Sequence, residues 1–68
     1  MAISLKAARV NAVLTRPEVI RRLKEEYGIK ISINTLSNYE NKKVQPNIET
    51  GKALASIYGR SVDDINFF

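Results

Sequence analysis

The sequence predicts an all-α protein, a compact bundle of four to five short helices. Apolar residues recur at the three- and four-residue spacing of helices, and no segment shows the alternation of a strand. A side chain that can cap a helix precedes each periodic segment: Ser4, Thr15, Ser32 and Asn47. Because 68 residues can bury only one small core, we expect a single domain over residues 1–68, with stability on the order of 5 kcal/mol.

The composition argues against several classes of function. The chain contains no Cys and no His, so it lacks the usual ligands of zinc, the means to form disulfides and the commonest catalytic side chains. So small a domain has little room for a substrate pocket. We therefore expect no enzymatic activity, no metal site and no cofactor. No apolar run is long enough to span a membrane and no signal peptide opens the chain, which predicts a cytoplasmic protein.

The charge is moderately basic. Eleven Lys and Arg residues stand against seven Asp and Glu, giving a net charge of +4. Such an excess favours a polyanionic partner such as nucleic acid. Many small soluble proteins are equally basic without binding anything, so the charge alone does not decide between these alternatives.

The first two helices are predicted from their caps. Ser4 caps a helix from about Leu5 to Leu14. Thr15 and Glu18 form a capping box for a second helix, from about Arg16 to Tyr27, which Gly28 ends. The predicted buried positions are Leu5, Ala8, Ala12 and Val13 on the first helix and Val19, Ile20, Leu23 and Tyr27 on the second.

The third helix, from Ile33 to about Asn41 after the Ser32 cap, has two unlike faces. Leu36, Tyr39 and Val44 form a narrow apolar seam for the core. The opposite face carries short polar but uncharged side chains: Asn34, Ser37, Asn38 and Asn41. Short amides and hydroxyls suit the reading of base edges in a major groove, although an ordinary solvated helix rich in Asn is the plain alternative.

Three cations accompany this helix in the sequence. Lys42 and Lys43 follow its end, where cations can hold phosphates and also suit the helix dipole. Arg16 stands at the N-terminus of the second helix, where a side chain and backbone N–H groups together can meet a phosphate.

The remaining chain predicts a fourth helix and a final turn. Asn47 caps a helix from about Ile48 to Tyr58, and Gly51 within it allows close packing against an unidentified partner. Its predicted buried residues are Ile48, Leu54, Ile57 and Tyr58. A last turn begins at Ser61, and the end of the chain is apolar: Val62, Ile65, Phe67 and Phe68. The connector around Gly28 joins the second and third helices as in a helix-turn-helix.

Taken together, these segments resemble the Cro/repressor-type (XRE) helix-turn-helix domain, the fold of lambda repressor. The resemblance covers nearly the whole chain, and its most specific segment is Thr35–Lys43 with Pro46 after it. The other matching segments are Leu5–Arg9, Leu14–Thr15, Glu18–Val19, Glu49–Thr50, Leu54–Ala55 and Tyr58–Ile65.

The resemblance implies a sequence-specific regulator that places the Ile33–Asn41 helix in the major groove of a double-stranded DNA operator, without a cofactor. The residues that would meet bases or adjacent phosphates are Ser32, Ile33, Asn34, Ser37 and Asn38. Arg16 would clamp a phosphate, and the loop residues Asn41, Lys42 and Lys43 would touch the DNA backbone. Arg9 and Glu40 match an internal salt bridge that ties the first helix to the recognition helix.

Two departures from the family pattern leave alternatives open. Lys24–Ile29 looks like about six extra residues before the recognition helix, which leaves the angle between the two helices open. Ile33 is apolar where the family often has Gln, Arg or Lys; it would contact a thymine methyl group or indicate a protein-binding surface.

The short chain resembles phage Cro-like proteins that control lysis and lysogeny in the cytoplasm of a bacterial host. The alternative is a phage modulator, or antirepressor, that binds a repressor protein through the helix-turn-helix surface. Val62, Ile65, Phe67 and Phe68 would either form a weak homodimer contact or cover the core of their own bundle. A dimer would read a two-fold operator with half-sites about one helical turn apart.

Overall fold

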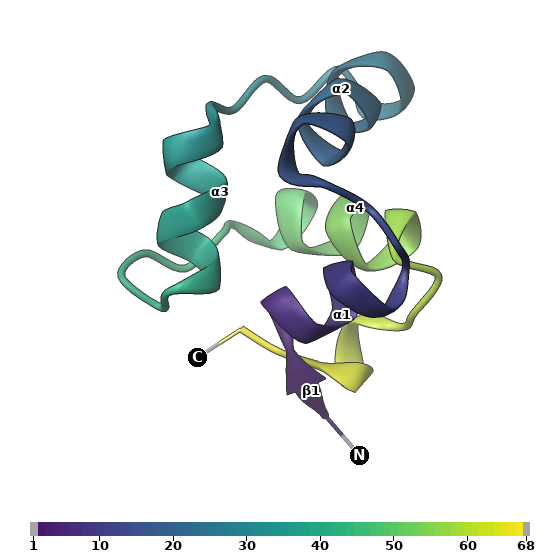
Figure 1. The fold of residues 1–68 in the computed structure, drawn as a ribbon, viewed down its shortest axis with the longest axis vertical. Helices are drawn as coiled ribbons and strands as arrows, with labels where there is room; N and C mark the ends of the chain where they lie inside the picture. Colours follow the sequence, from purple (N-terminus) through teal and green to yellow (C-terminus); the bar gives the residue numbers. More distant parts are fainter. Residues whose placement is uncertain (1, 68) are drawn as a thin grey trace.

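The computed structural model describes residues 2–67 and confirms the all-α bundle. The elements in chain order are β1 (Ile3–Ser4), α1 (Leu5–Asn11), α2 (Arg16–Tyr27), α3 (Ile33–Glu40), α4 (Ile48–Ile57), the 3₁₀ turn η1 (Val62–Asp64) and β2 (Ile65–Asn66). Figure 1 shows α4 at the centre of the bundle, with α2 and α1 beside it and α3 along one edge. No helix among residues 2–67 is long and apolar enough to cross a membrane.

All four α-helices begin at the predicted caps. The side chains of Ser4, Ser32 and Asn47 each accept a hydrogen bond from the backbone N–H three residues later, at 2.8–3.1 Å. At Thr15 the capping box is complete, because the Thr15 hydroxyl accepts from the Glu18 N–H while Glu18 accepts from the Thr15 N–H. Local side-chain chemistry therefore sets where each helix starts.

The observed helix ends agree less well with the predicted ones. Glycines in the left-handed conformation follow α2 and α4, as expected, but Val13 and Lys42 adopt the same conformation after α1 and α3, with φ of 58° and 61°. Each closes a Schellman motif, for example through Lys43 N–H to Asn38 C=O at 2.9 Å. The first helix therefore ends at Asn11 and not near Leu14, because Val13 already turns the chain out of the helix.

The core lies where the four helices meet. Leu23, Leu36, Leu54 and Val19 are its largest fully buried side chains. Four predicted core residues are wrong, and the two most exposed are Val13 at 85% and Ile48 at 79%. Val13 lies in the left-handed turn, and Ile48 is the first residue of α4, two residues before the helix becomes buried at Thr50. Val44 and Tyr27 are also exposed, contrary to the predicted seam and stripe.

The two ends of the described chain pair with each other. β1 and β2 are parallel, with Ile3 opposite Ile65, a feature too short to leave a periodic signal in the sequence. Ile65 is buried and Phe67 packs on the core. A Cβ atom at Gly51 would lie 3.6 Å from the Phe67 ring, which identifies the close neighbour of that glycine. Ile65 and Phe67 thus cover their own bundle, Val62 stays exposed, and Phe68 lies outside the described residues.

Candidate nucleic-acid interface

The third helix packs on the bundle along one side, where Tyr39 lies against the core beside two buried side chains. Leu36 and Glu40 lie one helical turn apart, and both are buried. Because α3 lies at the edge of the bundle (Figure 1), its opposite face is open to a partner. Ile33, Asn34 and Asn41 are exposed there, and Ser37 and Asn38 are half-buried. The predicted polar face is therefore on the outside, as the spacing of these residues requires.

The polar side chains of this face differ in how they are already bonded. The Ser32 hydroxyl caps α3, and the Asn41 amide donates to the Ser37 hydroxyl at 3.3 Å. The side chains of Asn34 and Asn38 make no hydrogen bond to any residue in the range 2–67. Their amide groups are therefore the ones on this face with full donor and acceptor capacity.

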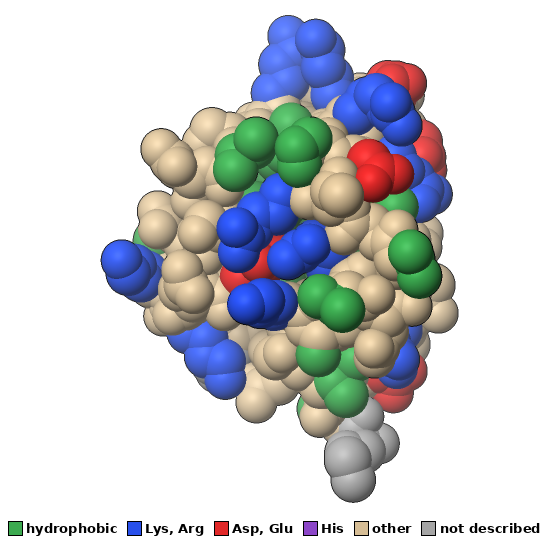
Figure 2. All heavy atoms as spheres, viewed as in Figure 1, with side chains coloured by type: hydrophobic (Ala, Val, Ile, Leu, Met, Phe, Trp, Pro, Cys, Tyr) green, Lys and Arg blue, Asp and Glu red, His purple; other side chains and the backbone are tan. Residues whose placement is uncertain are grey.

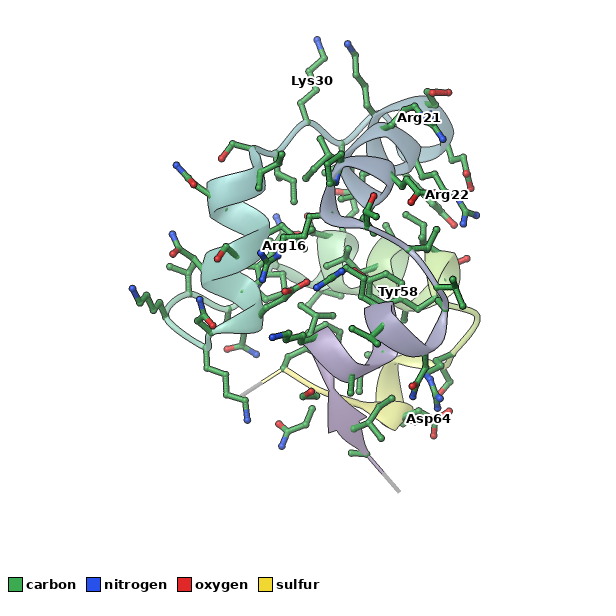
Figure 3. The ribbon with its side chains drawn as sticks, in the orientation of Figure 1. Arg16, Arg21, Arg22, Lys30, Tyr58 and Asp64 are labelled. Carbon is green, nitrogen blue, oxygen red and sulfur yellow. The ribbon has the colours of Figure 1, made fainter. Side chains whose placement is uncertain are left out.

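A charged cluster lies behind this face and joins α1, α2 and α3. The Glu40 carboxylate, with its side chain fully buried, accepts from Arg9 Nε at 2.7 Å and from Arg16 Nη2 at 2.9 Å. In Figure 3 the Arg16 side chain lies in the space between α2 and α3, and in Figure 2 basic side chains surround a partly covered acidic group in the middle of this view. We call Arg9, Arg16 and Glu40 the charged triad.

The two arginines of the triad have different surroundings. Arg9 is 12% exposed and also donates through Nη1 to the Leu14 carbonyl at 2.9 Å, so all three of its nitrogens are bonded. Arg16 is 34% exposed, and among residues 2–67 it bonds only Glu40 Oε1, through Nε and Nη2. The family resemblance predicted that Arg16 contacts a phosphate, but it did not predict the bond to Glu40. Residues 24 positions apart on different helices leave no local signal in the sequence.

Lys42 and Lys43 follow α3 and are exposed. Sequence reasoning placed them at the helix end but did not find the left-handed conformation of Lys42. The sequence held no signal for this conformation, because Gly or Asn favours it and the neighbouring Asn41 does not adopt it.

The Tyr58 hydroxyl is buried near the triad and has no hydrogen-bond partner among residues 2–67. Burial raises the pKa of this phenol, and the negative charge of Glu40 raises it further while Arg9 lowers it. The hydroxyl therefore stays protonated in the folded protein at neutral pH. Sequence reasoning identified Tyr58 as core but not as a buried polar group without a partner.

Tyr58→Phe should be neutral or stabilising at pH 7, by up to about 1 kcal/mol, because it removes an unsatisfied hydroxyl. The pKa of Tyr58 in the folded protein exceeds its value in the unfolded chain, about 10. Ionisation of Tyr58 therefore does not affect the free energy of unfolding below pH 10, and it lowers that free energy as the pH rises further, because the unfolded chain loses the proton first. Urea unfolding between pH 8 and 11 should show a smaller alkaline loss for Tyr58→Phe than for wild type. Tyr27→Phe is the control and should keep the wild-type loss; equal losses in all three proteins would contradict the prediction.

A comparison with protein-family models finds that a helix-turn-helix model matches residues 5–65. No curated protein and no solved structure gives a significant match to the chain. The matched range begins at the first residue of α1 and ends in β2, so it includes the four α-helices and, among them, the three that carry the polar face and the triad. The chain belongs to the Cro/repressor-type (XRE) family of helix-turn-helix proteins, which are DNA-binding transcriptional regulators.

Proposed function

We propose that the protein is a sequence-specific regulator that inserts α3, with Asn41 at its end, into the major groove of a double-stranded DNA operator. The observation that carries this proposal is the outer face of α3, which presents the free amides of Asn34 and Asn38. The cations Lys42 and Lys43 follow the helix, and the partly exposed Arg16 bonds Glu40 behind it. A free amide can pair with adenine through two hydrogen bonds. Cations at the edges of such a face hold the flanking phosphates.

The contacts divide by chemistry. Asn34 and Asn38 would read base edges, and Ile33, 45% exposed at the start of α3, would contact a thymine methyl group. Ser32 and Ser37, whose hydroxyls are already bonded, would meet the bases or phosphates beside these positions. Arg16, Asn41, Lys42 and Lys43 would bind the DNA backbone.

A helix of eight residues reads only a short stretch of DNA. We therefore propose that two copies act as a weak homodimer on a two-fold operator, with half-sites about one helical turn apart. The most fitting biological setting is lysis–lysogeny control by a phage or prophage in the cytoplasm of its bacterial host.

Selection of binding sequences from a randomised DNA pool tests the base-reading part of the proposal. Wild type should enrich one two-fold sequence, and Asn34→Ala or Asn38→Ala should change which bases are preferred. Lys43→Ala is the matched control, and it should weaken binding to all sequences alike while the preferred sequence stays the same. An unchanged preference in both Asn variants would refute the assignment of these residues.

A second candidate function, a modulator that binds a repressor protein, is favoured by apolar side chains at both ends of α3. Ile33 at its start and Val44 after its end are exposed, and Ile48 lies beside a hollow of about 450 Å³. The two functions differ in their response to salt. DNA binding with four to six phosphate contacts should weaken roughly 10²- to 10³-fold between 50 and 200 mM salt, whereas an apolar protein interface should hardly respond.

Lys42→Gly should stabilise the fold and weaken DNA binding. Glycine adopts the left-handed conformation without the cost that a side chain brings, so the free energy of unfolding should rise by about 1 kcal/mol. Loss of one phosphate contact should reduce the salt slope of binding by about 1. Thermal unfolding and anisotropy titrations measure the two effects.

Val13→Gly is the matched control, because Val13 has the same backbone conformation after α1 and carries no charge. It should stabilise the fold by a similar amount and leave DNA binding unchanged. If Lys42→Gly bound DNA as tightly as wild type and with the same salt slope, Lys42 would have no role at the phosphates.

A further inference from the structure

The charged triad has two positive charges but only one negative charge. Arg9 and Glu40 already form a complete ion pair, with two bonds between them and the third Arg9 nitrogen on a carbonyl. Arg16 adds a second positive charge to the same carboxylate oxygen, so the cluster carries a net charge of +1. A half-buried excess charge is unfavourable unless an anion balances it.

The open edge of Arg16 is where such an anion would bind. Its Nε and Nη2 are directed to Glu40, while Nη1 makes no hydrogen bond to any residue of the described chain. One third of the side chain is exposed, and Figure 3 shows it between α2 and the recognition helix α3. A guanidinium held on one edge and open on the other can donate to a phosphate in a fixed orientation.

We propose that Glu40 is a positioning residue for DNA binding, which holds the Arg16 guanidinium ready to receive a backbone phosphate. The inference rests on the proposed DNA-binding function and adds a role for a residue that does not touch the DNA. Arg9 neutralises Glu40 structurally, and Arg16 uses the same carboxylate as an anchor. Because the side chain is ordered before binding, less conformational entropy is lost when the phosphate arrives.

The experiment measures binding to a mixed-sequence DNA duplex of roughly 30 base pairs over a range of salt concentrations. Four proteins are compared: wild type, Arg16→Met, the double variant Arg9→Met with Glu40→Met, and the triple variant. The double variant removes a neutral ion pair, so the net charge does not change. Circular dichroism establishes that each protein is folded at the temperature of measurement.

Arg16→Met should weaken wild-type binding about three- to tenfold and reduce the salt slope by about 1 for each bound copy. The double variant should bind more weakly than wild type by a similar factor, and Arg16→Met should then have little additional effect. If Arg16→Met costs the same factor in both backgrounds, Glu40 does not position Arg16. If Arg16→Met has no effect in wild type while Lys43→Ala does, Arg16 binds no phosphate, although the proposed function stands.

A second variant keeps the test valid if the double variant does not fold. Arg16→Lys keeps the charge but cannot bond Glu40 with two nitrogens and point a third to solvent. It should bind DNA nearly as weakly as Arg16→Met, and wild-type affinity would overturn the inference. If wild type itself shows no salt-dependent binding to DNA, the proposed function fails, and the inference that rests on it fails as well.

Discussion

Glu40→Gln is expected to lower the free energy of unfolding by about 3–5 kcal/mol, enough to unfold much of a domain of this size at room temperature. The carboxylate is fully buried and is the anion of two arginine side chains. Its amide replacement leaves two neighbouring guanidinium groups without a counterion, and they repel each other in surroundings poor in water. Urea unfolding followed by circular dichroism measures the loss.

Glu26→Gln is the matched control. Glu26 also pairs with an arginine at 2.7 Å, but the side chains of Arg22 and Glu26 are 36% and 45% exposed, so water and salt screen their interaction. The unfolding midpoint of this variant should stay within error of wild type. If the two variants lost the same stability, the ion pairs would contribute through their geometry alone, and burial would not be the reason for the Glu40 effect.

Leu36→Ala is the second large effect we expect, with a loss of about 2–5 kcal/mol. Leu36 is the fully buried apolar residue of α3, and it packs in the core beside the partly buried Tyr39. Truncation leaves a cavity beneath the recognition helix, and the neighbouring leucines can fill it only in part. Hydrogen exchange should show that the amides of α3 lose more protection than those of α2.

Ile33→Ala provides the comparison within the same helix, since Ile33 is nearly half exposed. Its effect on the free energy of unfolding should be within about 0.5 kcal/mol. A loss as large as that of Leu36→Ala would mean that Ile33 is packed more tightly than its exposure indicates. Another residue would then have to make the proposed contact with the thymine methyl group.

The triad connects the stability of the fold to its proposed function. The same carboxylate that fixes α3 to α1 through Arg9 also orients Arg16 on α2. A substitution at Glu40 therefore affects both folding and the proposed phosphate contact, whereas one at Arg16 should affect mainly binding. For this reason the DNA-binding experiment above removes Glu40 only together with Arg9 and checks by circular dichroism that each variant is folded, while Glu40→Gln alone measures stability.

The candidate site could be predicted only in part from the sequence. The polar face of α3 was found because residues three and four positions apart lie on one side of a helix. Which of its side chains are free was not predictable, since the bond between Asn41 and Ser37 depends on the rotamers of both. The resemblance to the family supplied the Arg9 and Glu40 pair, but neither the resemblance nor the pattern indicated that Arg16 shares the carboxylate.

The sequence by itself determined the helix starts and the polar face of α3, because caps and helical periodicity act over four residues or fewer. It also indicated the family, through motifs spread over nearly the whole chain. Only the tertiary structure decided the charged triad, the exposure of Val13 and Ile48, and the pairing of Ile3 with Ile65. These features depend on residues brought together from distant parts of the chain or on a backbone conformation imposed where two helices must meet. Local sequence patterns do not predict these features, because the same patterns are compatible with many other tertiary arrangements.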